Sequence, residues 1–155
     1  MKNLVFALLV VATSISGCKK DEEFLSPEQQ LEKDIQIIKD YLVKNSINAT
    51  EHSTGLFYVI HTQGTGIYPS ATSRIKVNYE GRLLGKTEVF DSGTGVDFSL
   101  QNLITGWQIG FPLLREGASA TLYIPSGYAY GTRGSGSKIP ANAVLEFDVD
   151  LIDVL

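Results

Sequence analysis

The C-terminal segment constrains the fold of this 155-residue chain more than any other part of its sequence. From residue 145 to residue 151, apolar and acidic side chains alternate as Leu-Glu-Phe-Asp-Val-Asp-Leu. A period of two places the apolar side chains on one face of a β-strand and the carboxylates on the other. We therefore predict a strand over 144–155 that belongs to a sheet buried on one face. The carboxylates of Glu146, Asp148, Asp150 and Asp153 are predicted to form a solvated face rather than a metal site.

Three further segments have strand-like patterns, at 55–61, 74–84 and 118–125. The first is followed by the turn residues of 64–69. Residues 105–114 form the one short helix candidate among the strands, and Pro112 limits its length. The predicted fold class is α+β, with an antiparallel half-barrel sheet wrapped around one short helix and an extra N-terminal amphipathic helix.

The extra helix is predicted within 27–54, a segment that also contains the linker to the domain at 55–155. Ser26 is the expected N-cap, Pro27 takes the first helical position and Gln29 completes a capping box. Three- and four-residue spacing then gives an apolar stripe that ends near residue 45, made of Leu31, Ile35, Ile38 and Leu42. The remaining surface is assigned to charged residues, Lys33, Asp34, Lys39, Asp40 and Lys44. We favour packing of the stripe on the domain, and hence a monomer, over a helix-mediated dimer.

Residues 1–17 have the features of a secretory signal peptide. Lys2 precedes an apolar run at 4–12, which is shorter than the roughly 20 residues that cross a bilayer. The sequence Ile-Ser-Gly-Cys at 15–18 resembles the lipobox of bacterial lipoproteins. The resemblance implies cleavage before Cys18 and attachment of lipid to that residue. The alternative is a free thiol behind an ordinary signal peptide.

Residues 18–26 are predicted to form an acidic tether. The run Lys-Lys-Asp-Glu-Glu at 19–23 is either a solvated linker or, by resemblance, an acidic export tag of surface lipoproteins in some Gram-negative bacteria. The expected location is the cell envelope of a Gram-negative bacterium. There the chain would be lipid-anchored to the outer membrane, on its periplasmic side or exposed at the surface.

Several classes of function are disfavoured by composition. The net charge of −4 argues against nucleic-acid binding, which needs a basic face. Two histidines, His52 and His61, and one cysteine are too few for an ordinary zinc site. The glycine-rich segment 131–136 lacks the lysine of a phosphate-binding loop, and no nucleophile elbow is present. We expect no metal and no cofactor.

A set of short motifs in fixed order covers the domain: Val-Asn-Tyr-Glu-Gly at 77–81, Val-Phe-Asp-Ser at 89–92, Leu-Ile-Thr-Gly-Trp at 103–107, Ile-Pro at 124–125, Tyr-Ala-Tyr-Gly at 128–131, Ile-Pro at 139–140 and Leu-Glu-Phe-Asp-Val at 145–149. Together they resemble the FKBP-type peptidyl-prolyl cis-trans isomerases over 55–155. The resemblance implies catalysis of Xaa-Pro isomerisation in proline-containing polypeptides, without a cofactor. It also implies that macrolide inhibitors can bind.

The resemblance further implies a desolvated aromatic pocket. Its expected catalytic residues are Tyr79, Phe90, Asp91, Ile104, Trp107, Tyr130 and Phe147, and its expected substrate-binding residues are Leu103, Ile139 and Phe98. Trp107 would form the floor, the Ile104 N–H would bond a substrate carbonyl, and Asp91 would orient its neighbours. The aromatic residues could instead be ordinary core. The polar atoms of Tyr79, Asp91 and Tyr130 favour a pocket, because burying them without partners is costly.

The sequence also departs from the family pattern. Val96 stands where many members have a second wall aromatic, and an arginine that often pairs with the aspartate is absent. Ser135 and Lys138 replace bulkier groups in the loop before Ile139. These changes concern substrate preference and inhibitor affinity most directly. The alternative function is a non-catalytic chaperone or adaptor that binds proline-containing segments.

Overall fold

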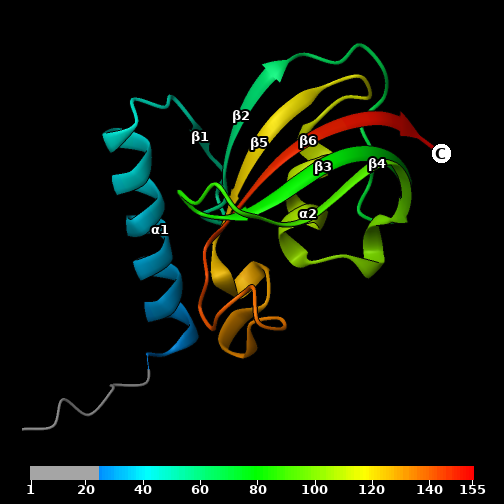
Figure 1. Cartoon of the computed structure of the whole chain (residues 1–155). Coiled ribbons are helices and arrows are strands. Elements are labelled where there is room, and N and C mark those ends of the chain that lie inside the picture. The colour runs from blue at the N-terminus through cyan, green and yellow to red at the C-terminus, as the bar shows by residue number, and fades with distance from the viewer. Residues whose placement is uncertain (1–24) are drawn as a thin grey trace, which may run out of the picture.

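A computed structural model describes residues 25–155 (Figure 1). The predicted signal peptide, Cys18 and most of the predicted tether lie outside the described residues. The helices are α1 (Pro27–Lys44) and α2 (Thr105–Gly110), and the strands are β1 (Thr50–Glu51), β2 (Phe57–Thr62), β3 (Arg74–Leu83), β4 (Val89–Ser99), β5 (Ser119–Ile124) and β6 (Leu145–Val154). One 3-10 turn follows β4 (Leu100–Asn102), one follows α2 (Phe111–Leu113), and two follow β5 (Ser126–Tyr128 and Gly131–Arg133).

The six strands form one antiparallel sheet in the order β1-β2-β5-β6-β3-β4. The sheet curves around α2, and α1 lies beside it (Figure 1). Side chains of α2 and of the inner face of the sheet meet in the main core, which includes Trp107, Phe111, Leu122, Ile124 and Phe147. The predicted α+β half-barrel around a short helix is confirmed.

The central strand β6 follows the alternation of its sequence. Leu145, Phe147, Val149 and Leu151 are buried, whereas the carboxylate residues between them are half-buried or exposed. Burial of such side chains contributes about 1.5–3 kcal/mol each, so this pattern fixes which face of the strand meets α2.

The strand pattern of the sequence does not predict β4. This strand contains Gly93 and Gly95, and its buried and exposed positions do not alternate regularly. It is an edge strand that pairs only with β3, and its register shifts twice along that pairing. Bulges of this kind are typical of sheet edges and remove the period of two from the sequence.

Helix α1 begins with the full capping box at Ser26 and Gln29. Its buried residues Ile38 and Leu42 pack in a second cluster with Phe57, Tyr123 and Val144. The apolar stripe of the helix is therefore covered by the domain of its own chain. No helix within residues 25–155 is long and apolar enough to cross a membrane.

Candidate functional site

A cavity of about 180 Å³ opens beside the start of α2. Eight of the ten predicted pocket residues line it: Tyr79, Asp91, Phe98, Leu103, Ile104, Trp107, Tyr130 and Phe147. They come from β3, β4, the segment before α2, α2 itself, the loop after β5, and β6. The fold thus brings together side chains that are up to 68 residues apart in sequence (79 to 147).

Trp107 is the centre of an aromatic cluster beneath this cavity. Helix α2 directs it inward, and its side chain is 4% exposed. Its ring centroid lies 5.2 Å from that of Tyr79, 5.9 Å from Phe98, 5.3 Å from Phe147 and 5.0 Å from Phe111, all in edge-on arrangements. Edge-to-face pairs at these distances are the favoured geometry for aromatic rings and hold one another in place.

Polar atoms lie at the edge of the cavity. The Tyr79 hydroxyl donates a hydrogen bond to Asp91 Oδ2 at 3.0 Å. Desolvation and this hydrogen bond raise the pKa of Tyr79 to about 12. Desolvation, followed by the charge of Asp91, also raises the pKa of Tyr130. Both phenols therefore remain neutral hydrogen-bond donors at physiological pH.

The Tyr79 pKa gives a direct test of this geometry. Since the pKa is raised in the folded state, the stabilisation from the neutral phenol is fully present below about pH 10 and is lost as the pH rises towards 12. In a spectrophotometric titration, phenolate absorbance is measured against pH for the wild type and for Tyr79→Phe. The difference between the two curves should show one phenolate that forms near pH 12. A difference transition near pH 10 would contradict the arrangement.

Two predicted pocket residues, Phe90 and Ile139, lie beside this cavity rather than on it. They line a neighbouring cavity of about 380 Å³ together with Lys138 and the loop before Ile139. Asp91 and Tyr130 line both cavities, so the two are adjacent. The Phe90 ring packs edge-on against Phe147 at 5.6 Å and supports the pocket wall from behind.

The backbone of Ile104 lies at the start of α2, beside the cavity. Ile104 is the N-cap of α2, and its carbonyl accepts hydrogen bonds from the N–H groups of Trp107 and Gln108. None of the hydrogen bonds among residues 25–155 uses the Ile104 N–H as donor. Since Ile104 lines the cavity, this donor is available to a carbonyl group bound there.

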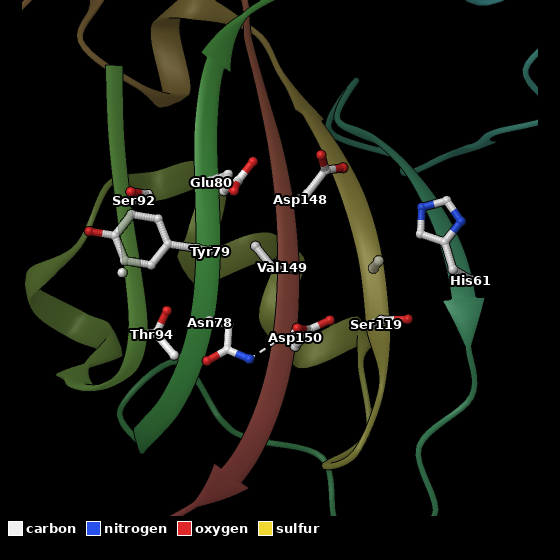
Figure 2. Close-up of a pocket in the computed structure, with 12 residues that line it drawn as sticks. His61, Asn78, Tyr79, Glu80, Ser92, Thr94, Ser119, Asp148, Val149 and Asp150 are labelled. Atoms are coloured by element: carbon white, nitrogen blue, oxygen red, sulfur yellow. Dashed lines mark hydrogen bonds between the residues drawn. The ribbon is translucent and has the colours of Figure 1, made fainter. Parts of the chain in front are cut away.

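A third hollow, of about 420 Å³, lies on the outer face of the sheet (Figure 2). It is shallow and polar, and Figure 2 shows its side chains spread over several strands, with His61 on β2 apart from Asn78 and Asp150. Its polar groups have hydrogen-bond partners within the protein: Asn78 donates to Asp150 at 3.1 Å, and Asp148 accepts from the nearby Thr121 hydroxyl at 2.7 Å. We interpret it as the solvated sheet face that the alternation of β6 predicts.

The sequence interpretation of Asp34 was wrong. It placed Asp34 with the charged residues on the solvated surface of the helix, but the residue is completely buried. Its carboxylate accepts hydrogen bonds from the backbone N–H and the hydroxyl of Ser126, at 2.7 and 2.5 Å. Ser126 is 92 residues away and belongs to the loop that carries Tyr130, so no local sequence pattern could reveal the pairing.

Comparisons with known proteins agree on one family. The profile described as "FKBP-type peptidyl-prolyl cis-trans isomerase" matches residues 66–152. The probable FKBP-type isomerase FkpA of Neisseria meningitidis serogroup B is 43% identical over 127 residues, which cover 79% of this chain and 46% of that protein. The FKBP-type 22 kDa isomerase of Escherichia coli K12 is 35% identical over 125 residues, which cover 78% of this chain and 59% of that protein.

The fold of this chain is similar to that of a solved isomerase structure. The crystal structure of a peptidyl-prolyl cis-trans isomerase from Pseudomonas syringae pv. tomato superimposes with a TM-score of 0.70 at 32% identity, and the match covers 79% of this chain and 94% of that one. The chain spans about half the length of the curated relatives it matches. Its sequence profile, its identity to these relatives and its fold agree, and the chain belongs to the FKBP-type peptidyl-prolyl cis-trans isomerase family.

Proposed function

We propose that the chain is a peptidyl-prolyl cis-trans isomerase that accelerates Xaa-Pro isomerisation in extracytoplasmic proteins. The observation that carries the proposal is the small cavity beside Trp107, which is lined mainly by aromatic and aliphatic side chains together with Asp91. A cavity of this kind can hold a prolyl ring and leave the peptide backbone at the rim. The names of the relatives support the same activity.

Isomerisation of an Xaa-Pro bond changes the conformation of the substrate but not its covalent structure. Rotation about an Xaa-Pro bond has a barrier of about 18–20 kcal/mol, because it interrupts amide resonance. Without a catalyst it takes tens to hundreds of seconds and can limit folding. No bond to the substrate is made or broken, so neither a nucleophile nor a general base is required.

The residues of the cavity can lower this barrier in two ways. The planar amide is more polar than the twisted one, so the aromatic enclosure around Trp107 destabilises the planar form relative to the twisted form. Donors at the rim, the Ile104 N–H and the Tyr130 hydroxyl, can hold the substrate carbonyl in one orientation while the other side of the bond turns. A millionfold acceleration would need about 8 kcal/mol from these contributions together.

The test is a protease-coupled assay on a set of Xaa-Pro peptides. We expect acceleration that saturates with peptide concentration and is inhibited by a macrolide that fills the pocket. A non-catalytic chaperone or adaptor would instead bind the same peptides saturably and leave their isomerisation rate unchanged. That second result would overturn the proposed activity.

We also propose that the chain acts from a lipid anchor at Cys18 in the outer membrane of a Gram-negative envelope. The support is the sequence of residues 1–18, which precede the described residues. An N-terminal cysteine that carries several acyl chains would bind a membrane stably, which a single chain does not achieve. We expect Cys18→Ser to move the protein from the membrane fraction to the soluble fraction of lysed cells. Full retention in the membrane fraction would contradict the anchor.

A further inference from the structure

The completely buried carboxylate of Asp34 joins α1 to the loop that carries Tyr130. Oδ2 accepts both hydrogen bonds from Ser126, and Oδ1 accepts one from Gln30 Nε2 at 2.7 Å. Within residues 25–155, no lysine or arginine forms an ion pair with it. Burying a carboxylate is costly, so these three hydrogen bonds are what makes the position tolerable.

Ser126 is the first residue of the turn that leads to Tyr130. The Ala129 N–H donates to the Ser126 carbonyl at 3.0 Å, so the carboxylate and the turn are linked directly. The same loop has two further attachments: the Tyr128 hydroxyl donates to the Thr54 carbonyl at 3.0 Å, and the Asn142 N–H donates to the Gly131 carbonyl at 2.8 Å.

These attachments flank Tyr130, whose own side chain is partly exposed. The side chain of Tyr130 is 36% exposed at the edge of the cavity, whereas Ser126 is 1% exposed. Figure 1 shows the segment after β5, in orange, beside the N-terminal half of α1. The loop is therefore fixed from the side of the helix, and Tyr130 projects from it towards the cavity.

We infer that Asp34 is a positioning residue for isomerisation, which holds the Tyr130 hydroxyl at the pocket by fixing Ser126. The inference rests on the proposed function. Its consequence is that α1, which lies outside the matched region 66–152, is part of the functional unit. A donor displaced by about 1 Å can cost up to about 100-fold in rate, so modest loosening of the loop is measurable.

The experiment compares Asp34→Ala with Asp40→Ala in the full chain. Asp40 is a matched control: it lies on the same helix and accepts from Gln36 Nε2 at 2.7 Å, as Asp34 does from Gln30, but it is exposed. At a temperature where circular dichroism shows each variant folded, we expect kcat/KM to fall about tenfold for Asp34→Ala and less than about twofold for Asp40→Ala. Asp34→Asn keeps one oxygen for Ser126 and should recover most of the activity.

A double-mutant cycle separates positioning from general destabilisation. If Asp34 acts through Tyr130, Tyr130→Phe should cost much less in the Asp34→Ala background than in the wild type. Should Asp34→Ala fold poorly, Ser126→Ala provides the same cycle, because it removes only the hydroxyl bond. If the two substitutions instead reduce kcat/KM by independent factors in a protein that is active, the inference about Asp34 is overturned and the proposed function is not. A wild-type chain without turnover would overturn the proposed function itself.

Discussion

Trp107→Ala is expected to reduce kcat/KM for Xaa-Pro isomerisation by about 100-fold or more. The substitution removes a large side chain that lines the cavity and leaves Tyr79, Phe98 and Phe147 without the ring against which each packs. It should also lower the free energy of unfolding by about 3–5 kcal/mol, the usual range for removal of a large buried aromatic. The two effects are measured separately, by the protease-coupled assay and by urea unfolding.

Trp107→Phe tests whether activity depends on an aromatic ring at this position. Within residues 25–155 the buried Nε1 of Trp107 has no hydrogen-bond partner, so replacement by phenylalanine removes ring area but no such bond. We expect this variant to remain folded and to retain much more activity than Trp107→Ala. If Trp107→Ala were folded and fully active, Trp107 would not be part of the site.

Gly106→Ala is expected to be the second most damaging of the substitutions considered. An added Cβ would lie 2.4 Å from Cγ2 of Ile124, which is completely buried in β5 and cannot move aside. Alanine gains about 0.5–1 kcal/mol over glycine in a helix, but overpacking of a core costs about 1–3 kcal/mol. We expect a net loss of stability, and a fall of about tenfold in kcat/KM because α2 must shift and carry Trp107 with it.

Two controls accompany this prediction. Gly127→Ala places a Cβ in open space in the loop near the site, so it should leave stability and turnover nearly unchanged. Ile124→Ala removes the side chain that the new Cβ would meet, and Gly106→Ala should therefore cost less in that background. If urea unfolding shows that Gly106→Ala lowers the free energy of unfolding equally in the wild type and in Ile124→Ala, the steric explanation is contradicted.

The sequence predicted those parts of the molecule that depend on local periodicity or on a recognisable set of motifs. The alternation in β6 indicated its buried face, and the capping box of Ser26 and Gln29 matches the observed start of α1. The short motifs singled out eight residues that line the common cavity. In each case the information lies within a few neighbouring residues or in a resemblance to many other chains.

The features that the sequence did not reveal depend on contacts between distant segments. Strand β4 has no regular alternation, because its shifted pairing with β3 breaks the period of two. The sequence groups Phe90 with the pocket residues, and the fold packs its ring against Phe147 and places it in the lining of two neighbouring cavities. Asp34 looks like any exposed helix aspartate until the fold brings Ser126 against it.

The position of the indole ring has a practical consequence. The chain has a single tryptophan, and that residue lines the cavity. Intrinsic fluorescence of the unlabelled protein therefore reports on this one location, without contributions from tryptophans elsewhere. Binding of a peptide or a macrolide in this cavity can then be followed by fluorescence, independently of any measurement of turnover.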